Sequence, residues 1–139
     1  MGVAKRLKEA NKNIKIYALE PDKMPLLTEN KIISNHKIEG IGDDFIPKLV
    51  DRSLIDKVFV INDDDAVNMA RKLALELGLG VGISSGANML ASVLAGEENV
   101  VTVFADDNKK YLSTELSDSV VDNEKFISNK IELLGYEFL

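Results

Sequence analysis

Residues 81–88, with the sequence VGISSGAN, combine the residue types that can bind a flat or anionic ligand at the start of a helix. Ser84 and Ser85 carry hydroxyl groups that can donate hydrogen bonds, and serine is also a favoured N-cap residue. Gly82 and Gly86 allow a tight turn and leave space beside the backbone. A helix N-terminus adds free N–H groups and a partial positive charge. The pattern permits two interpretations, an ordinary helix cap or a hydroxyl donor to a ligand.

A second candidate is the segment Gly40, Ile41 and Gly42, which lies in a long irregular stretch between residues 20 and 47. Two glycines separated by one residue let backbone amides approach a ligand, although the same pattern also occurs in ordinary turns. His36 lies close by, but the chain has no second histidine to form a cluster with it. We therefore expect His36 to be a solvated loop residue.

Two groups of acidic residues also have the composition of binding sites. Asp63, Asp64 and Asp65 precede a helical pattern, where they would cap the helix and compensate its dipole rather than bind a metal. Asp106 follows an apolar run over residues 99–105. Ligands of open parallel sheets bind at the carboxyl ends of the strands, so Asp106 either faces a cleft or simply forms a turn.

The composition excludes several classes of protein. The 139 residues suffice for a single core, and a net charge of −6 without a basic stripe makes nucleic acid an improbable partner. The chain has no cysteine and one histidine, so we expect neither disulfides nor a metal site. No apolar run approaches the ~18 residues of a membrane span. These features predict a soluble, cytoplasmic protein that does not bind membranes.

The pattern of apolar residues predicts a doubly wound α/β fold, with an open, mostly parallel sheet and flanking helices. Continuous apolar runs predict buried strands, and apolar residues at helical spacing predict helices. The predicted strands cover residues 14–19, 57–61 and 99–105, and the predicted helices cover residues 3–10, 63–77, 86–95 and 122–134. We expect a short helical or turn segment over residues 111–116.

Taken together, VGISSGAN, HKIEGIGDDFIP and KKYLST resemble the cysteine synthase and cystathionine β-synthase family, which are pyridoxal-phosphate (PLP) enzymes of fold type II. The resemblance runs from about residue 3 to residue 116 and includes IKIYALEP and VVTVFADDNKKYLST. It implies that residues 1–121 are a C-terminal portion of the larger domain of such an enzyme. Residues 122–139 then form a variable helix and tail.

The resemblance also implies roles for individual residues. Ser84 matches the serine that hydrogen-bonds the pyridine nitrogen of PLP. Gly40, Ile41 and Gly42 match the loop that borders the cofactor and the incoming nucleophile. Asp106 matches the acidic residue of the family's Pro-Asp-Ser turn, close to the ring nitrogen. These five residues are the predicted cofactor-binding residues.

The chain departs from the family in three respects. Its turn reads Ala105-Asp106-Asp107, without the proline or the serine, and its EGIGDDF segment is nearer to the cystathionine β-synthase version. The family's first half, with the Schiff-base lysine and the loops that bind phosphate and substrate carboxylate, has no counterpart here. We therefore expect no catalytic residue in this chain and no activity of the chain alone.

The resemblance implies a parent enzyme that forms L-cysteine from an activated serine, such as O-acetylserine, and sulfide. A cystathionine β-synthase-type condensation, a stand-alone non-catalytic binding or regulatory module, and a generic α/β ligand binder are the alternatives. The helix over residues 86–95 and the strands would be partly uncovered, and exposed apolar patches favour association. We therefore expect a homodimer or another form of self-association.

Overall fold

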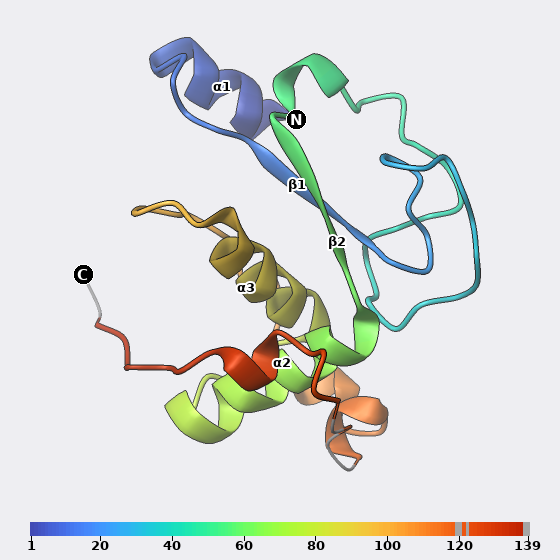
Figure 1. Cartoon of the computed structure of the whole chain (residues 1–139), viewed down its shortest axis with the longest axis vertical. Coiled ribbons are helices and arrows are strands. Elements are labelled where there is room, and N and C mark those ends of the chain that lie inside the picture. The colour runs from blue at the N-terminus through green and yellow to red at the C-terminus, as the bar shows by residue number, and fades with distance from the viewer. Residues whose placement is uncertain (119–120, 122, 138–139) are drawn as a thin grey trace.

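The computed structural model describes residues 1–118, 121 and 123–137. Its main elements are α1 (Gly2–Ala10), β1 (Tyr17–Pro21), β2 (Lys57–Ile61), α2 (Asp63–Leu77) and α3 (Ile83–Ala95) (Figure 1). Short 3-10 turns cover Arg52–Leu54, Lys109–Tyr111, Glu115–Ser117 and Ser128–Lys130. Within the described residues, no helix has the length and apolar character needed to cross a membrane.

The two strands form a parallel sheet in which Tyr17 lies opposite Lys57 and Pro21 lies opposite Ile61. This arrangement confirms the α/β class and the parallel pairing. The first strand starts later than predicted, because the Asp56 carboxylate accepts the backbone N–H of Ile16 at 2.8 Å just before the ladder begins. The long connection between the strands leaves the carboxyl end of β1 and returns to the start of β2 (Figure 1).

Helix α3 contacts both strands on one side and α2 on the other, so the described chain has a sheet–helix–helix order (Figure 1). The two helices approach closely at Gly86, where a Cβ atom would lie 2.1 Å from the carbonyl oxygen of Ala66. The core at this junction consists of small and apolar side chains, among them Ala66, Met69, Ala70, Leu73, Ile83, Ala87 and Leu90. Only a residue without a side chain allows this helix spacing at Gly86.

Local signals define α2 as predicted. The Asn62 side chain caps the helix by accepting the N–H of Asp65 at 3.1 Å, and Gly78 ends it in the left-handed conformation with φ 71°. Helix α3 begins earlier than predicted. Its N-cap is Gly82, without a side-chain cap, so Ser84 and Ser85 lie inside the first turn instead of capping it.

The predicted strand over residues 99–105 is wrong for the described chain. This segment has no strand assignment and pairs with no described strand, and Val101 is 97% exposed. Apolar composition alone does not form a strand, because the ladder hydrogen bonds require a neighbouring strand. An isolated antiparallel bridge between Val81 and Asp107 follows the segment.

The predicted helix over residues 122–134 is also wrong where it can be compared. Asp122 lies outside the described residues, and residues 123–137 contain the short 3-10 turn Ser128–Lys130 but no α-helix. Phe126 and Ser128 are nevertheless buried against the body of the protein. Contacts to α2 therefore hold this segment, as its hydrogen bonds show below.

Candidate functional site

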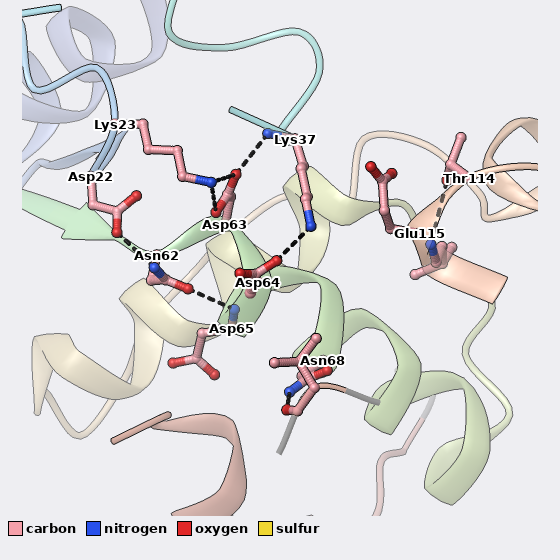
Figure 2. A network of polar contacts seen from close by, with 12 residues as sticks. Asp22, Lys23, Lys37, Asn62, Asp63, Asp64, Asp65, Asn68, Thr114 and Glu115 are labelled. Carbon is pink, nitrogen blue, oxygen red and sulfur yellow. Dashed lines mark hydrogen bonds and ion pairs between the residues drawn. The ribbon is translucent and has the colours of Figure 1, made fainter. Parts of the chain in front are cut away.

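Polar side chains join the carboxyl ends of the two strands (Figure 2). Asn62 donates from Nδ2 to Asp22 Oδ2 at 2.7 Å, which connects the residues that follow β2 and β1. Asp63 is completely buried and accepts from Lys23 Nζ at 2.9 and 2.8 Å. It also accepts the backbone N–H of Lys37 at 3.0 Å. The buried Asp63 carboxylate therefore fixes the long connection between the strands to the start of α2.

The other two aspartates hold two further contacts. Asp64 accepts from Lys37 Nζ at 2.7 Å, and this hydrogen bond raises the pKa of Lys37. Asp65 accepts the backbone N–H groups of Ile127 at 2.7 Å and Ser128 at 3.0 Å. Each of the three carboxylates thus accepts hydrogen bonds from the protein itself. In addition to their place at the helix dipole, the aspartates attach distant segments to α2.

The glycine segment has a geometry that only glycine adopts easily. Gly40 and Gly42 have φ values of +84° and +67°. A Cβ atom on Gly42 would lie 2.7 Å from His36 Nε2 and 2.8 Å from Pro21 Cγ. The His36 ring contacts the Gly42 oxygen through Nε2 at 2.9 Å and accepts the N–H of Ile38 through Nδ1 at 3.2 Å. His36 is half-buried with both nitrogens engaged, so the expectation of a solvated loop histidine is wrong.

Ser84 lies in the first turn of α3 and is half-buried. Among the described residues, its hydroxyl has no hydrogen-bond partner. The neighbouring Ser85 is fully buried, and its Oγ also lacks a partner within the described part of the chain. A hydroxyl at a helix N-terminus that is not used for capping remains available to donate to a ligand.

Asp106 lies against Gly82 at the start of α3. Its backbone oxygen accepts the N–H of Gly82 at 3.0 Å, and a Cβ on Gly82 would lie 2.1 Å from its Oδ1. Asp106 Oδ2 accepts from the Tyr111 hydroxyl at 2.7 Å and lies 3.0 Å from Lys110 Nζ. Burial raises the pKa of Tyr111. Asp106 thus supports the turn that precedes Ser84. The sequence alone indicated neither this role of Asp106 nor the contribution of Tyr111, which belongs to the KKYLST motif.

One hydrophobic cluster brings the three motifs together. Ile38, Val81, Ile83 and Tyr111 are buried in it, and Ile41 packs against it. The glycine segment, the start of α3 and the KKYLST turn therefore border the same core, although they are far apart in the sequence. The cofactor contacts of Ser84, Asp106 and the glycine segment remain predictions.

Comparison with known proteins identifies the family. The family model described as "Pyridoxal-phosphate dependent enzyme" matches residues 1–106. A cysteine synthase B from Campylobacter jejuni is 42% identical over 119 residues, covering 83% of this chain and 39% of the relative. The chain thus spans about two-fifths of the length of this curated relative.

Solved structures agree with this match. A hydrogen sulfide-producing enzyme from Fusobacterium nucleatum is 47% identical with a TM-score of 0.86, covering 93% of this chain and 40% of that one. A cysteine synthase from Entamoeba histolytica is 35% identical with a TM-score of 0.80, covering 91% and 39%. The resemblance found in the sequence is therefore confirmed, and the chain belongs to the family of pyridoxal-phosphate dependent enzymes with the type II fold.

Proposed function

We propose that this chain forms one wall of the PLP site of a cysteine synthase-like enzyme, which joins an activated serine, such as O-acetylserine, with sulfide to give L-cysteine. The observation that carries the proposal is the Ser84 hydroxyl. It lies at the N-terminus of α3, between two close-packed glycines, and has no partner among the described residues. Membership of the PLP family supports the same assignment.

The residues present fit one end of the cofactor. PLP has a flat pyridine ring whose nitrogen accepts a hydrogen bond, and Ser84 offers a free donor for it. Oδ2 of the Asp106 carboxylate is engaged by Tyr111 and Lys110, and Oδ1 is buried against Gly82 without a partner among the described residues, so Asp106 suits the support of α3 better than direct contact with the ring. Gly40 is exposed with open space around its α-carbon, which allows a close approach of a ligand to the backbone.

The proposed division of labour follows from these positions. Bound PLP supplies an electron-poor ring that stabilises negative charge on the amino-acid substrate. Ser84 would hold the ring nitrogen through a neutral hydroxyl, which would leave the ring less electron-poor than a carboxylate partner would. Gly40, Ile41 and Gly42 border the side from which the sulfur nucleophile arrives. None of the lysines of this chain is assigned the covalent attachment of the cofactor.

A pair of variants in α3 tests the role of Ser84. Ser84→Ala removes the proposed donor, whereas Ser92→Ala removes a hydroxyl that only bonds the Asn88 carbonyl within the same helix at 2.8 Å. The chain is combined with a polypeptide that supplies the family's lysine and phosphate loops, and PLP binding is followed by absorbance. We expect Ser84→Ala to weaken binding about 5- to 10-fold, the net worth of one hydrogen bond, and Ser92→Ala to leave it unchanged. Equal affinities would contradict the assignment.

The same preparation distinguishes the candidate reactions. The EGIGDDF segment is nearer to the cystathionine β-synthase version of the family motif, and the Fusobacterium enzyme of similar structure is named for hydrogen sulfide production. Release of sulfide or formation of cystathionine is therefore the alternative to cysteine synthesis. Chromatography of the products formed from O-acetylserine with sulfide, and from serine with homocysteine, together with a sulfide assay, decides among them.

The proposal extends to self-association through a groove of about 710 Å³ between α1, β1, α3 and residues 99–102. Val3 and Val101, which line it, are 75% and 97% exposed. Covering such apolar surface with a second copy is favourable. Light scattering should show association that Val101→Lys reduces and Leu75→Lys, outside the groove, does not.

A cytoplasmic location belongs to the same proposal and is tested by cell fractionation.

A further inference from the structure

We propose that His36 is the positioning residue of the glycine segment, residues 40–42, and that it acts as the neutral imidazole with its proton on Nε2. The importance of this positioning for catalysis rests on the proposed function, in which residues 40–42 border the cofactor. The positioning itself follows from contacts within the chain. Its ring connects a residue that is anchored in the core to a glycine that has no side chain of its own.

The two contacts of the ring define its tautomer. The backbone N–H of Ile38 can only donate, so Nδ1, at 3.2 Å from this nitrogen, must be the unprotonated acceptor. The carbonyl oxygen of Gly42 can only accept, so Nε2, at 2.9 Å, must carry the proton. Only the neutral ring with the proton on Nε2 satisfies both contacts. A cationic ring or the other neutral tautomer loses the hydrogen bond from Ile38.

The residues next to His36 are firmly held. The Ile38 side chain is fully buried in the main hydrophobic cluster. The backbone N–H of Lys37 donates to Asp63 Oδ2 at 3.0 Å, and Asp63 is itself fully buried at the start of α2. The two residues that follow His36 are therefore fixed, one by a backbone hydrogen bond and one by burial of its side chain. This fixed point gives the ring a defined direction.

The contact between the His36 ring and Gly42 determines where the glycines lie. Gly42 fits between the His36 ring and Pro21, the last residue of β1, with hypothetical Cβ distances of 2.7 and 2.8 Å to them. Gly40 has no atom within 4 Å of its hypothetical Cβ, so packing does not locate it. The hydrogen bond from His36 to the half-buried Gly42 thus defines the distance between Gly42 and the carboxyl end of β1, and with it the position of the exposed Gly40 two residues earlier. These are the backbone groups that the proposed function places beside the cofactor.

The tautomer can be measured directly, because His36 is the single histidine of the chain. Long-range ¹⁵N–¹H correlation spectra of the labelled 139-residue chain at neutral pH show which ring nitrogen carries the proton. We expect a protonated Nε2 and an unprotonated Nδ1. A proton on Nδ1, or a rapidly averaged mixture of the two tautomers, would overturn the proposal.

Two conservative variants separate the effects of the two hydrogen bonds of the ring, that of Nδ1 with Ile38 and that of Nε2 with Gly42. His36→Gln places an amide donor near the position of Nε2 and lacks an acceptor for Ile38. His36→Asn places an acceptor near Nδ1 and is too short to reach Gly42. We expect the Ile38 amide to exchange roughly fivefold faster in the Gln variant, which corresponds to one lost hydrogen bond. The Gly42 resonances should shift in the Asn variant and return towards the wild-type positions in the Gln variant.

The tautomer, the Gly42 resonances and the exchange of the Ile38 amide are all measured without the cofactor, and the Ile38 rate is compared with those of other core amides so that a change in global stability is recognised. Both variants are compared with the wild type after circular dichroism has shown a folded chain, and either one suffices if the other fails to fold. Unchanged Gly42 resonances in His36→Asn would refute the positioning role. Shifted resonances together with unchanged PLP affinity in the combined preparation would instead contradict the placement of residues 40–42 beside the cofactor, while the positioning by His36 would stand.

Discussion

The carboxylate of Asp106 lies directly against the α-carbon of Gly82, so that a Cβ atom on Gly82 would come within 2.1 Å of Oδ1 and 2.6 Å of Cγ. The Tyr111 hydroxyl holds the other carboxylate oxygen at 2.7 Å, which prevents the side chain from simply turning away. This contact connects the turn after residue 105 to the first turn of α3. It therefore determines where the Ser84 hydroxyl lies.

Gly82→Ala should destabilise the chain by roughly 1–3 kcal/mol, because the added methyl group overpacks this contact. Chemical denaturation monitored by circular dichroism gives the free energy of unfolding. In an Asp106→Ala background the cost of Gly82→Ala should fall but not vanish, since the clashing carboxylate is absent while Tyr111 Cε2, at 2.8 Å from the added Cβ, remains. Equal costs in the two backgrounds would show that the carboxylate is not the obstacle.

Gly86→Ala should reverse the usual effect of replacing a helical glycine. Alanine normally stabilises a helix interior by about 1 kcal/mol relative to glycine. Here the new Cβ would lie 2.1 Å from the carbonyl oxygen of Ala66 and 2.8 Å from the nitrogen of Ala70, and backbone atoms cannot move aside as a side chain can. We expect a loss of roughly 1–3 kcal/mol in the free energy of unfolding.

Gly2→Ala is the matched control for that prediction. Gly2 is the first residue of α1, and its hypothetical Cβ has no neighbour within 4 Å. Its replacement should be neutral or slightly stabilising in the same denaturation experiment. If Gly86→Ala behaved like Gly2→Ala, α2 and α3 would not be in the close contact described above.

Asp63→Asn should destabilise the chain much more than Asp64→Asn. Asp63 is fully buried and accepts three hydrogen bonds, two of them from the Lys23 ammonium group, so we expect a loss of roughly 1.5–3 kcal/mol. The side chains of Asp64 and its partner Lys37 are 31% and 32% exposed, and such a pair contributes about 0–1 kcal/mol. Denaturation of the two isosteric variants gives the comparison, and similar losses would refute the anchoring role of Asp63.

Asp56 should contribute stability that disappears in acid. The hydrogen bond from Lys8 and then that from the N–H of Ile16 hold the pKa of Asp56 below its ordinary value of 3.8. A carboxyl group with a lowered folded pKa stabilises the protein above its unfolded pKa, and this contribution is lost as the pH falls through the folded value.

Unfolding curves measured over a pH series test this expectation. The chain and its Asp56→Asn variant should differ in stability at neutral pH and converge as the pH falls below 3.8. A constant difference between the chain and Asp56→Asn across the series would rule out ionisation as its origin.

Local signals explain which elements could be predicted from the sequence. The cap at Asn62, the apolar spacing from Ala66 to Leu73 and the stop at Gly78 act within a few residues, and α2 has the predicted bounds. Strand β2 also matches its predicted range. Residues 99–105 and 122–134 have equally clear patterns. A strand needs a hydrogen-bonded neighbour, however, and α2 holds the tail through Asp65 in place of a regular helix.

The sequence by itself determined the family, the PLP connection and the motifs that meet at one hydrophobic cluster, because these depend on residue types in a fixed order. The tertiary structure decided which atoms those motifs use. His36 is 6 residues from Gly42, Asp63 is 26 residues from Lys37, and Asp65 is 62 residues from Ile127. Such contacts depend on how the chain packs around the sheet and α2, which periodicity and local propensity do not encode.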